Sequence, residues 1–132
     1  MLNFSVSNAA LENALRALWQ RTGTIGHNIT NQDTPGFKAR RVSFEDALAR
    51  EIDFIRSGRG GAISRREALE RITNVRTTEY RLEGVPTRAD GNNVDIINEQ
   101  IELARVQDQY RAVSQRISSH YAGLNDAIRG GR

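Results

Sequence analysis

The sequence predicts a mainly α-helical protein in which long N- and C-terminal helices pack as an antiparallel, coiled-coil-like pair. Two observations support this prediction: apolar residues recur at helical spacing in both terminal parts of the chain, and no proline interrupts either repeat. A length of 132 residues suits one domain. We therefore expect a single elongated domain over residues 1–132, with an N-terminal helix over 7–33, an irregular middle segment over 34–93 and a C-terminal helix over 94–129.

The N-terminal helix is predicted by apolar residues that alternate three and four positions apart. Its expected packing residues are Leu11, Leu15, Leu18, Ile25 and Ile29. Ser7 or Asn8 would cap its start. Gly23 and Gly26 each weaken a helix by about 1 kcal/mol relative to alanine. A closely approaching neighbour would explain why they are tolerated.

A turn is expected directly after this helix, at Thr34-Pro35-Gly36-Phe37. The spacing predicts a type II turn, because Pro35 fixes φ at the second position and Gly36 supplies a positive φ at the third. The residue before a proline avoids helical geometry, so the helix should end before Thr34. Asn28 and Asn31 share one helical face just before the turn, where their amides can bind backbone groups freed at the helix end.

The middle segment is predicted to hold only short elements. Helical spacing predicts one helix, capped by Ser43, whose apolar face is Phe44, Leu48, Ile52 and Ile55. A capping box predicts a second short helix beginning at Ser64-x-x-Glu67. The residues from Thr73 to Leu82 are rich in β-formers and would suit a short β-hairpin. The glycines of residues 57–61 predict a flexible loop.

The C-terminal helix carries the strongest repeat in the chain. One row, spaced every seven positions, is Ile96, Leu103, Tyr110, Ile117 and Leu124. A second row beside it is Glu99, Val106, Val113, His120 and Ala127. Asn92, Asn93 or Asp95 would cap the helix start, and Gly130-Gly131 would end it.

The length of this helix indicates that it needs a long partner. At 1.5 Å per residue it would extend roughly 50 Å, whereas a compact globule of this size has a radius of gyration of about 14 Å. Two interpretations follow. The terminal helices form a hairpin that buries its own core, or they also pack against copies or relatives of themselves.

Composition excludes several classes of site. The chain has no cysteine, so neither a disulfide framework nor a thiolate metal site is possible. No apolar run approaches the ~20 residues of a membrane span, and residues 1–4 lack the basic and apolar regions of a cleavable signal. Residues 38–88 hold 12 of the 19 basic side chains and 8 of the 16 acidic ones. This basic excess leaves nucleic-acid binding as an alternative function.

Catalytic chemistry has little support in the sequence. His27 and His120 stand alone, without a cysteine or a plausible carboxylate partner, and we interpret both as structural. The segment 90–95 superficially resembles a calcium loop. Its fifth position is Val94, where an oxygen ligand is required, so helix capping is the better interpretation. We expect no catalytic, metal or cofactor site and no enzymatic activity.

Two motifs at opposite ends of the chain carry a family resemblance. The first is Asn28-x-x-Asn31-x-x-Thr34-Pro35-Gly36-Phe37-Lys38, and the second is Asp90-Gly91-Asn92-Asn93-Val94-Asp95. The first resembles the N-terminal motif of bacterial flagellar axial proteins. The second, together with Lys38 to Phe44, resembles one branch of them, the basal-body rod proteins of FlgB type in the proximal rod. The resemblance covers residues 8–48 and 88–130, and departs from the family at Thr30 and Gln32, where alanine is usual.

The resemblance implies a structural subunit that polymerises through its terminal helices into a drive shaft, which crosses the periplasm and transmits torque for motility. Such a subunit is exported by the flagellar type III apparatus without a cleaved signal. Its implied partners are copies of itself, other rod proteins and the adaptor at the membrane-ring junction, with no nucleic acid and no membrane span. The segment expected to face a neighbouring subunit carries Lys38, Arg40, Arg41 and Phe44.

The alternative is a small helical nucleic-acid-binding protein that uses the basic middle segment. Salt dependence distinguishes the two functions. Phosphate-driven binding weakens steeply as salt rises, whereas assembly through apolar seams does not.

Overall fold

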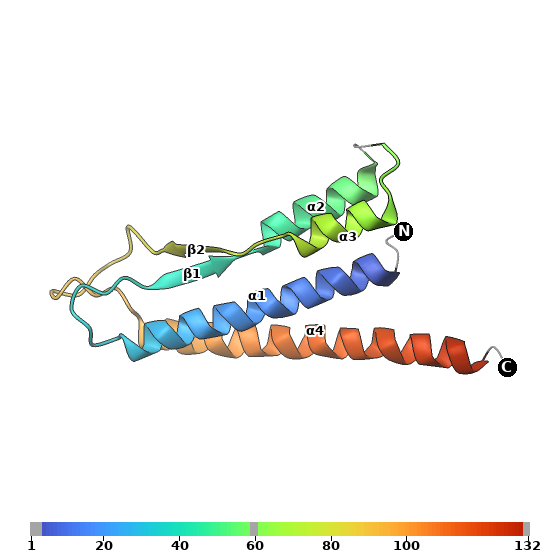
Figure 1. The fold of residues 1–132 in the computed structure, drawn as a ribbon. Helices are drawn as coiled ribbons and strands as arrows, with labels where there is room; N and C mark the ends of the chain where they lie inside the picture. Colours follow the sequence, from blue (N-terminus) through green and yellow to red (C-terminus); the bar gives the residue numbers. More distant parts are fainter. Residues whose placement is uncertain (1–3, 59–60, 131–132) are drawn as a thin grey trace. The chain divides into compact units, whose positions relative to one another are not determined.

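The computed structural model describes residues 4–58 and 61–130 and confirms a mainly helical fold (Figure 1). Its elements are α1 (Phe4–Thr30), β1 (Arg40–Ser43), α2 (Glu45–Ser57), α3 (Arg65–Thr73), β2 (Thr78–Arg81) and α4 (Ile96–Gly130). The chain divides into two compact units. The first unit comprises Met1–Arg16, Phe44–Arg76 and Arg111–Arg132, and the second comprises Ala17–Ser43 and Thr77–Tyr110.

The first unit packs the beginning of α1 against α2, α3 and the end of α4. Its buried core is Val6, Ala68 and Ile72, against which pack the partly buried Ala9, Ala10, Leu48, Ile52, Ile55 and Leu69. On another side of α1, the Phe4 ring stacks on His120 with centroids 5.5 Å apart. Asn8 Oδ1 lies 2.9 Å from His120 Nδ1. The two terminal helices therefore pack together here, as their apolar repeats predict.

The second unit holds the other half of the α1–α4 pair and a two-stranded antiparallel sheet. β1 pairs with β2, with Arg41 opposite Tyr80 and Val42 opposite Glu79. The guanidinium of Arg21 on α1 donates to the Val42 carbonyl at 2.7 and 3.0 Å. These bonds tie β1 to α1.

A strand forms in the segment expected to make a β-hairpin, but its partner is different. β2 pairs with β1, far earlier in the chain, rather than with another part of residues 73–82. The reason is that the start of this segment is already used: Thr73 ends α3, and the Val75 carbonyl accepts a bond from the Asn13 amide at 3.0 Å. Too few residues remain for two strands.

The helix starts confirm some expected caps and correct others. Ser64 accepts from the Glu67 N–H at 3.2 Å, which confirms that cap. α1 already includes Phe4, so Ser7 and Asn8 lie inside the helix and do not cap it. Ser43 ends β1 instead of capping α2, because Phe44 occupies the cap position without a side-chain hydrogen bond. The predicted loop at 57–61 lies partly outside the described residues.

The predicted seam residues differ in burial. The most deeply buried are Leu18, Ile25 and Val106. Partly buried are Leu11, Leu15, Ile29, Ile96, Leu103, Val113 and Ile117. Tyr110 and Leu124 remain 38% and 42% exposed. A Cβ added at Gly23 or Gly26 would meet no atom within 4 Å, so the close neighbour suggested by these glycines is not supplied by the described residues.

We predict that Ile72→Ala destabilises the isolated chain by about 2–5 kcal/mol, because it leaves a cavity beneath α1. Ile72 is 0% exposed, whereas Ile97 is 67% exposed. Ile97→Ala is the matched control and should change the free energy of unfolding by no more than about 0.5 kcal/mol. Urea denaturation of dilute protein measures both. Equal losses would show that Ile72 is not part of the core.

Candidate functional site

A buried carboxylate on α4 connects three elements of the second unit. Glu99 is 1% exposed. Arg41 on β1 donates to it through both terminal nitrogens, with Nη2–Oε1 at 2.6 Å and Nη1–Oε2 at 3.0 Å. Asn28 on α1 donates through Nδ2 to Oε2 at 3.0 Å. We call Asn28, Arg41 and Glu99 the Glu99 junction.

Asn28 also fixes the start of β1. Its Oδ1 accepts from the Arg40 N–H, and its Nδ2 donates to the Arg40 carbonyl, each at 2.9 Å. A single carboxamide thus serves the backbone of β1 and the carboxylate of α4. Throughout the described residues, no buried side-chain nitrogen or oxygen lacks a hydrogen-bond partner. The junction is therefore a satisfied polar network.

The physical role of the junction is to select one arrangement of its elements. Burying a carboxylate is costly unless it is paired and hydrogen-bonded. Here a bidentate guanidinium and an amide meet that requirement, the former in the strongest geometry available to an ion pair. A shift of α4 along α1 would separate Glu99 from both donors and leave its charge buried. The junction thus stabilises this register over others.

A second polar contact holds the segment that follows α1. The Nδ2 of Asn92 lies 3.0, 3.1 and 2.8 Å from the carbonyl oxygens of Asn31, Gln32 and Thr34. These residues follow α1, which ends at Thr30, so regular helix bonds do not serve their carbonyls. Asn92, which is 0% exposed, supplies a donor from another part of the chain. This corrects the expectation that Asn92 caps α4.

Asp95 takes the α4 cap instead. Its Oδ1 accepts from the N–H groups of Ile97 and Asn98 at 3.0 and 3.2 Å. Asn93, the third candidate, binds elsewhere: its Oδ1 accepts from Ala39 N–H at 2.7 Å, and its Nδ2 donates to the Leu82 carbonyl at 2.8 Å. The two asparagines therefore connect the start of α4 to the rest of the second unit.

The predicted type II turn is present and contacts the second motif. Gly36 has a φ of +72°, and Phe37 N–H donates to the Thr34 carbonyl at 3.2 Å. The Gly36 N–H donates to the Asp90 carbonyl at 2.8 Å. A Cβ on Gly91, whose φ is +81°, would lie 3.5 Å from Gly36 Cα. The two sequence motifs, far apart in the chain, therefore meet at this turn.

Asn31 binds the end of α1, as expected, whereas Asn28 does not. Asn31 Nδ2 donates to the His27 carbonyl at 2.8 Å, within the last turn of α1, and its Oδ1 accepts from Thr34 Oγ1 at 3.1 Å. Asn28 binds β1 and Glu99 instead of the helix end. Val94 of the second motif is 8% exposed and donates its N–H to Asn92 Oδ1 at 2.7 Å.

The residues expected to face a partner are mostly engaged within the chain. Phe44 is 6% exposed, because a large apolar side chain before an amphipathic helix is stabilised by burial. Arg41 belongs to the Glu99 junction, and Lys38 Nζ donates to the Gly91 carbonyl at 2.5 Å. Arg40 alone of these four keeps an exposed side chain, which pairs with Glu79 at 3.1 Å. The expectation is therefore wrong for Phe44 and Arg41.

Sequence reasoning missed the pairing of Glu99 with Arg41. A signal was present, since Glu99 is the one acidic residue in a row that is otherwise apolar, small or histidine. A buried acid requires a donor. The sequence does not indicate which of the 19 basic residues supplies it, because the choice depends on how β1 lies against the helices.

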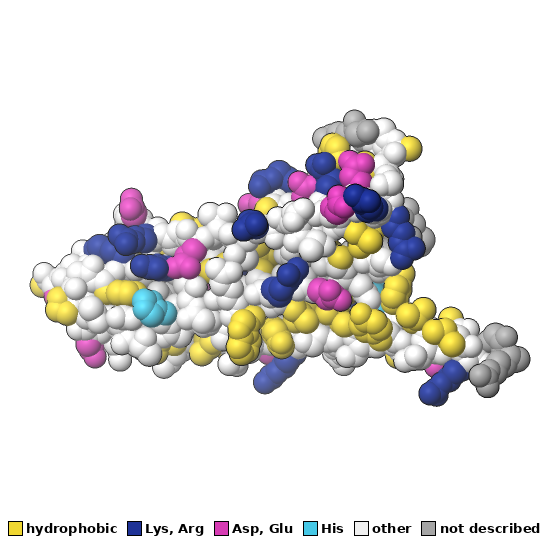
Figure 2. Space-filling model, viewed as in Figure 1, with side chains coloured by type: hydrophobic (Ala, Val, Ile, Leu, Met, Phe, Trp, Pro, Cys, Tyr) yellow, Lys and Arg dark blue, Asp and Glu magenta, His cyan; other side chains and the backbone are white. Residues whose placement is uncertain are grey.

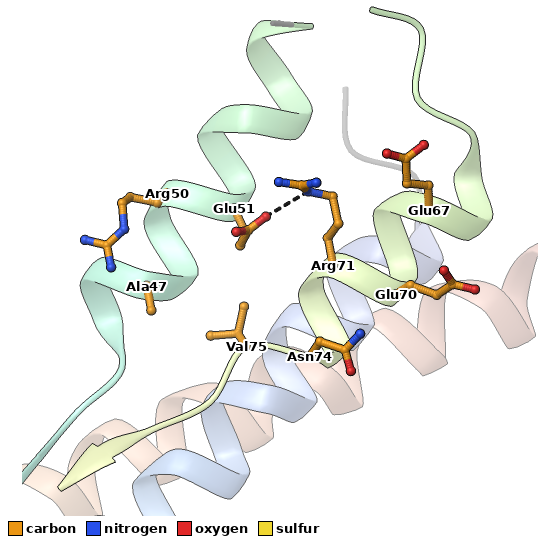
Figure 3. Close-up of a pocket in the computed structure, with 8 residues that line it drawn as sticks. All are labelled: Ala47, Arg50, Glu51, Glu67, Glu70, Arg71, Asn74 and Val75. Carbon is orange, nitrogen blue, oxygen red and sulfur yellow. Dashed lines mark hydrogen bonds and ion pairs between the residues drawn. The ribbon is translucent and has the colours of Figure 1, made fainter. Parts of the chain in front are cut away.

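A groove between α2 and α3 in the first unit has charged walls (Figure 3). It has a volume of about 450 Å³. Figure 3 shows Arg71 of α3 pointing toward Glu51 of α2, with Nε and Oε2 2.9 Å apart. The Arg71 guanidinium also lies 4.0 Å from the centre of the Phe54 ring. This ion pair joins the two helices.

The part of the chain that the structure describes contains no cluster of side chains suited to bind a metal ion. No group of three or more His, Asp or Glu side chains gathers there as metal ligands would. The contacts that do gather are those of the Glu99 junction, the two asparagines and the turn. Their arrangement holds helices and strands in place, so the candidate site is a structural junction.

Comparison with known proteins identifies similar chains. No protein-family model matches the sequence. Three curated relatives are each called flagellar basal body rod protein FlgB. The Bacillus subtilis protein is 32% identical over 137 residues, covering 98% of both chains. The Aeromonas hydrophila protein is 32% identical over 89% of this chain and 88% of its own, and the Escherichia coli protein is 26% identical over 91% of each.

We predict that Glu99→Ala destabilises the chain by about 3–5 kcal/mol, because it leaves the Arg41 charge without its partner in a largely buried place. The matched control is Glu102→Ala on the same helix, which removes an exposed pair with Arg105. That control should cost less than about 1 kcal/mol. Urea denaturation measures both losses. A Glu99→Ala loss no larger than that of the control would contradict the structural role of the junction.

Asn92→Asp is predicted to be more damaging than Asn92→Ala. Alanine only removes the donor to the carbonyls of Asn31, Gln32 and Thr34, and we expect a loss of about 1–3 kcal/mol. Aspartate places a second acceptor against the three carbonyl oxygens and adds a buried charge. Asn98→Ala, at an exposed asparagine with one side-chain bond to Asp95, is the control. Thermal unfolding followed by circular dichroism ranks the variants, and an aspartate milder than alanine would refute the assigned contacts.

Proposed function

Because this chain belongs to the FlgB family of flagellar basal body rod proteins, we propose that it polymerises through its terminal helices into the proximal part of the rod. It is a structural subunit of the flagellar basal-body rod. The proposed assembly is a drive shaft that transmits torque. Its subunits act by packing, without an enzymatic role.

The observation that carries this proposal is the apolar surface left uncovered on α4. Figure 2 shows hydrophobic side chains gathered along this helix. The exposed apolar residues of α4 are Ile97, Ile101, Tyr110, Tyr121, Leu124 and Ile128, each between 38% and 67% exposed. By their spacing, Tyr110, Tyr121, Leu124 and Ile128 share one side of the helix, whereas Ile97 and Ile101 lie on another. Exposed apolar groups that share a face mark an interaction surface. This favours terminal helices that pack within the chain and also between subunits.

The proposed route and partners follow from the same family. We place the assembled subunit across the periplasm, after export through the flagellar type III apparatus without a cleaved signal. No helix in the described ranges is long and apolar enough to cross a membrane. The proposed partners are copies of this chain, other rod proteins and the adaptor at the membrane-ring junction.

Nucleic-acid binding has no support in the structure or the relatives. Several basic side chains of the middle segment pair with acidic ones, among them Arg66–Glu70 and Arg71–Glu51, each at 2.9 Å. Figure 2 likewise shows basic and acidic side chains interspersed on the visible face. A phosphate-binding surface gathers positive charge on one face, and the curated relatives are rod proteins. We therefore retain the structural function alone.

Ile117→Asp is predicted to abolish swimming and rod assembly while leaving export intact. Ile117 is half-buried on the packing face of α4, and a carboxylate without a partner there costs several kcal/mol. Gln115→Asp, at an exposed position two residues away, is the control. Swimming assays, periplasmic detection and imaging of purified basal bodies with labelled protein measure the three properties.

The labelled wild-type chain should lie in the rod, and the Gln115→Asp strain should swim normally. Absence of the wild-type label from basal bodies would refute the rod assignment. Normal swimming with Ile117→Asp would instead remove this residue from the assembly face. Loss of the Ile117→Asp protein before export would show that the substitution acts on folding or stability inside the cell.

A further inference from the structure

A groove lies beside the start of α4 in the second unit. It has a volume of about 650 Å³, within the range of typical binding pockets. Its lining is mixed: Val85, Pro86, Val94 and Ile96 are apolar, and the rest, which includes Arg88 and Asp95, is polar or charged. Val85 is 40% exposed, so its side chain is available to a partner. We call this surface the Val85 groove.

An apolar ridge lies at the other end of the same helix, in the first unit. Phe4, the first described residue of α1, contacts His120 and Tyr121, with ring centroids 5.5 and 6.4 Å away. α4 then continues to Gly130. Leu124 and Ile128 stand on this continuation at 42% and 66% exposure, four residues apart.

The spacing of this ridge suits docking into a groove. Tyr121, Leu124 and Ile128 occupy positions i, i+3 and i+7, so they lie on one face of the helix. Amphipathic helices bind apolar grooves through anchors at this spacing. The last ten residues of α4, from Tyr121 to Gly130, therefore present an apolar face, which we call the α4 end.

Charge complementarity connects the two surfaces. Glu83 lies two residues before Val85, and Arg129 directly follows Ile128. Within the described residues neither side chain has a hydrogen bond or an ion pair. Both are exposed. Glu83 and Arg129 are thus unpaired charges of opposite sign, each near an exposed apolar residue. Asp95 in the groove lining adds a second negative charge to the groove side, and Asp126 of the α4 end lies on the opposite side of that helix from Ile128.

We propose that the α4 end of a second copy of this chain docks in the Val85 groove, with Ile128 against Val85 and Arg129 beside Glu83. This inference rests on the proposed rod function and names a contact that would build the rod. The groove and the ridge are different surfaces of one chain, so their pairing is heterologous. Each copy keeps one free groove and one free ridge, and such contacts extend into a filament unless the rotation between copies closes a ring.

Disulfide cross-linking tests the docking, because the chain has no native cysteine. Two single variants, Val85→Cys and Ile128→Cys, carry tags of different size and are mixed and oxidised at high protein concentration. We expect the mixed disulfide to exceed each homodimer by about tenfold, which corresponds to a preference of about 1.4 kcal/mol. Gln107→Cys, an exposed position on α4, replaces Ile128→Cys in the control.

The outcomes separate the possible contacts. A dominant mixed disulfide that disappears with Gln107→Cys supports the docking. A dominant Ile128 homodimer would overturn it in favour of a symmetric contact between two helix ends. Equal yields with Ile128→Cys and Gln107→Cys, or no cross-link, would also overturn it. Circular dichroism of each variant verifies that it is folded.

Charge exchange provides an independent test of the same contact. In the Val85→Cys background, Glu83→Arg should lower the mixed-disulfide yield several-fold, because it places two cations together. Arg129→Glu in the Ile128→Cys partner should restore the yield. Failure of this rescue would contradict the proposed ion pair.

Failure of the docking and failure of the rod function are distinguishable. If labelled wild-type chain lies in basal bodies but the cross-link does not form, the docking is wrong and the function stands. If the cross-link forms but the labelled chain is absent from basal bodies, the copies associate in a different structure and the rod function is wrong.

Discussion

The Glu99 carboxylate lies where α1, β1 and α4 meet, and the arrangement of the second unit depends on it. Three donors from two different elements converge on its two oxygens. Apolar seams tolerate sliding, since one heptad resembles the next. A buried charge does not, because displacement leaves it unpaired. The junction thus supplies the positional selectivity that the repeats of leucine, isoleucine and valine lack.

Local chemistry explains which parts of the fold could be predicted from the sequence. The turn at Gly36 and the cap at Ser64 depend on residues within a few positions, so composition and spacing suffice. The seams follow from periodicity. The partners of Arg41 and Asn92 depend on segments far away in the chain. Asn92 precedes a helix and so resembles a cap, but Asp95 is nearer and takes that role. The Asn92 amide is then free to bind the segment that follows α1.

Some of the predicted seam residues are buried within the chain, and others remain exposed on its surface. Ile25 and Val106 are each 1% exposed, so other parts of the same chain cover them. Tyr110 and Leu124 lie in the most regular row of α4 yet stay substantially exposed. Periodicity identifies a packing face without stating which molecule covers it, so sequence alone could not separate the buried pair from the exposed pair. The exposed fractions in the structure separate them.

The contacts between α1 and α4 join residues that are very distant in the chain. Asn28 and Glu99 are 71 positions apart, and Asn8 and His120 are 112 apart. Closing such long loops is entropically unfavourable and slows folding. Until residues 96–130 are available, α1 lacks α4, its longest helical partner. A subunit exported as proposed would therefore remain an open, threadable chain in transit, and its helices would pair only after both ends reach the same compartment.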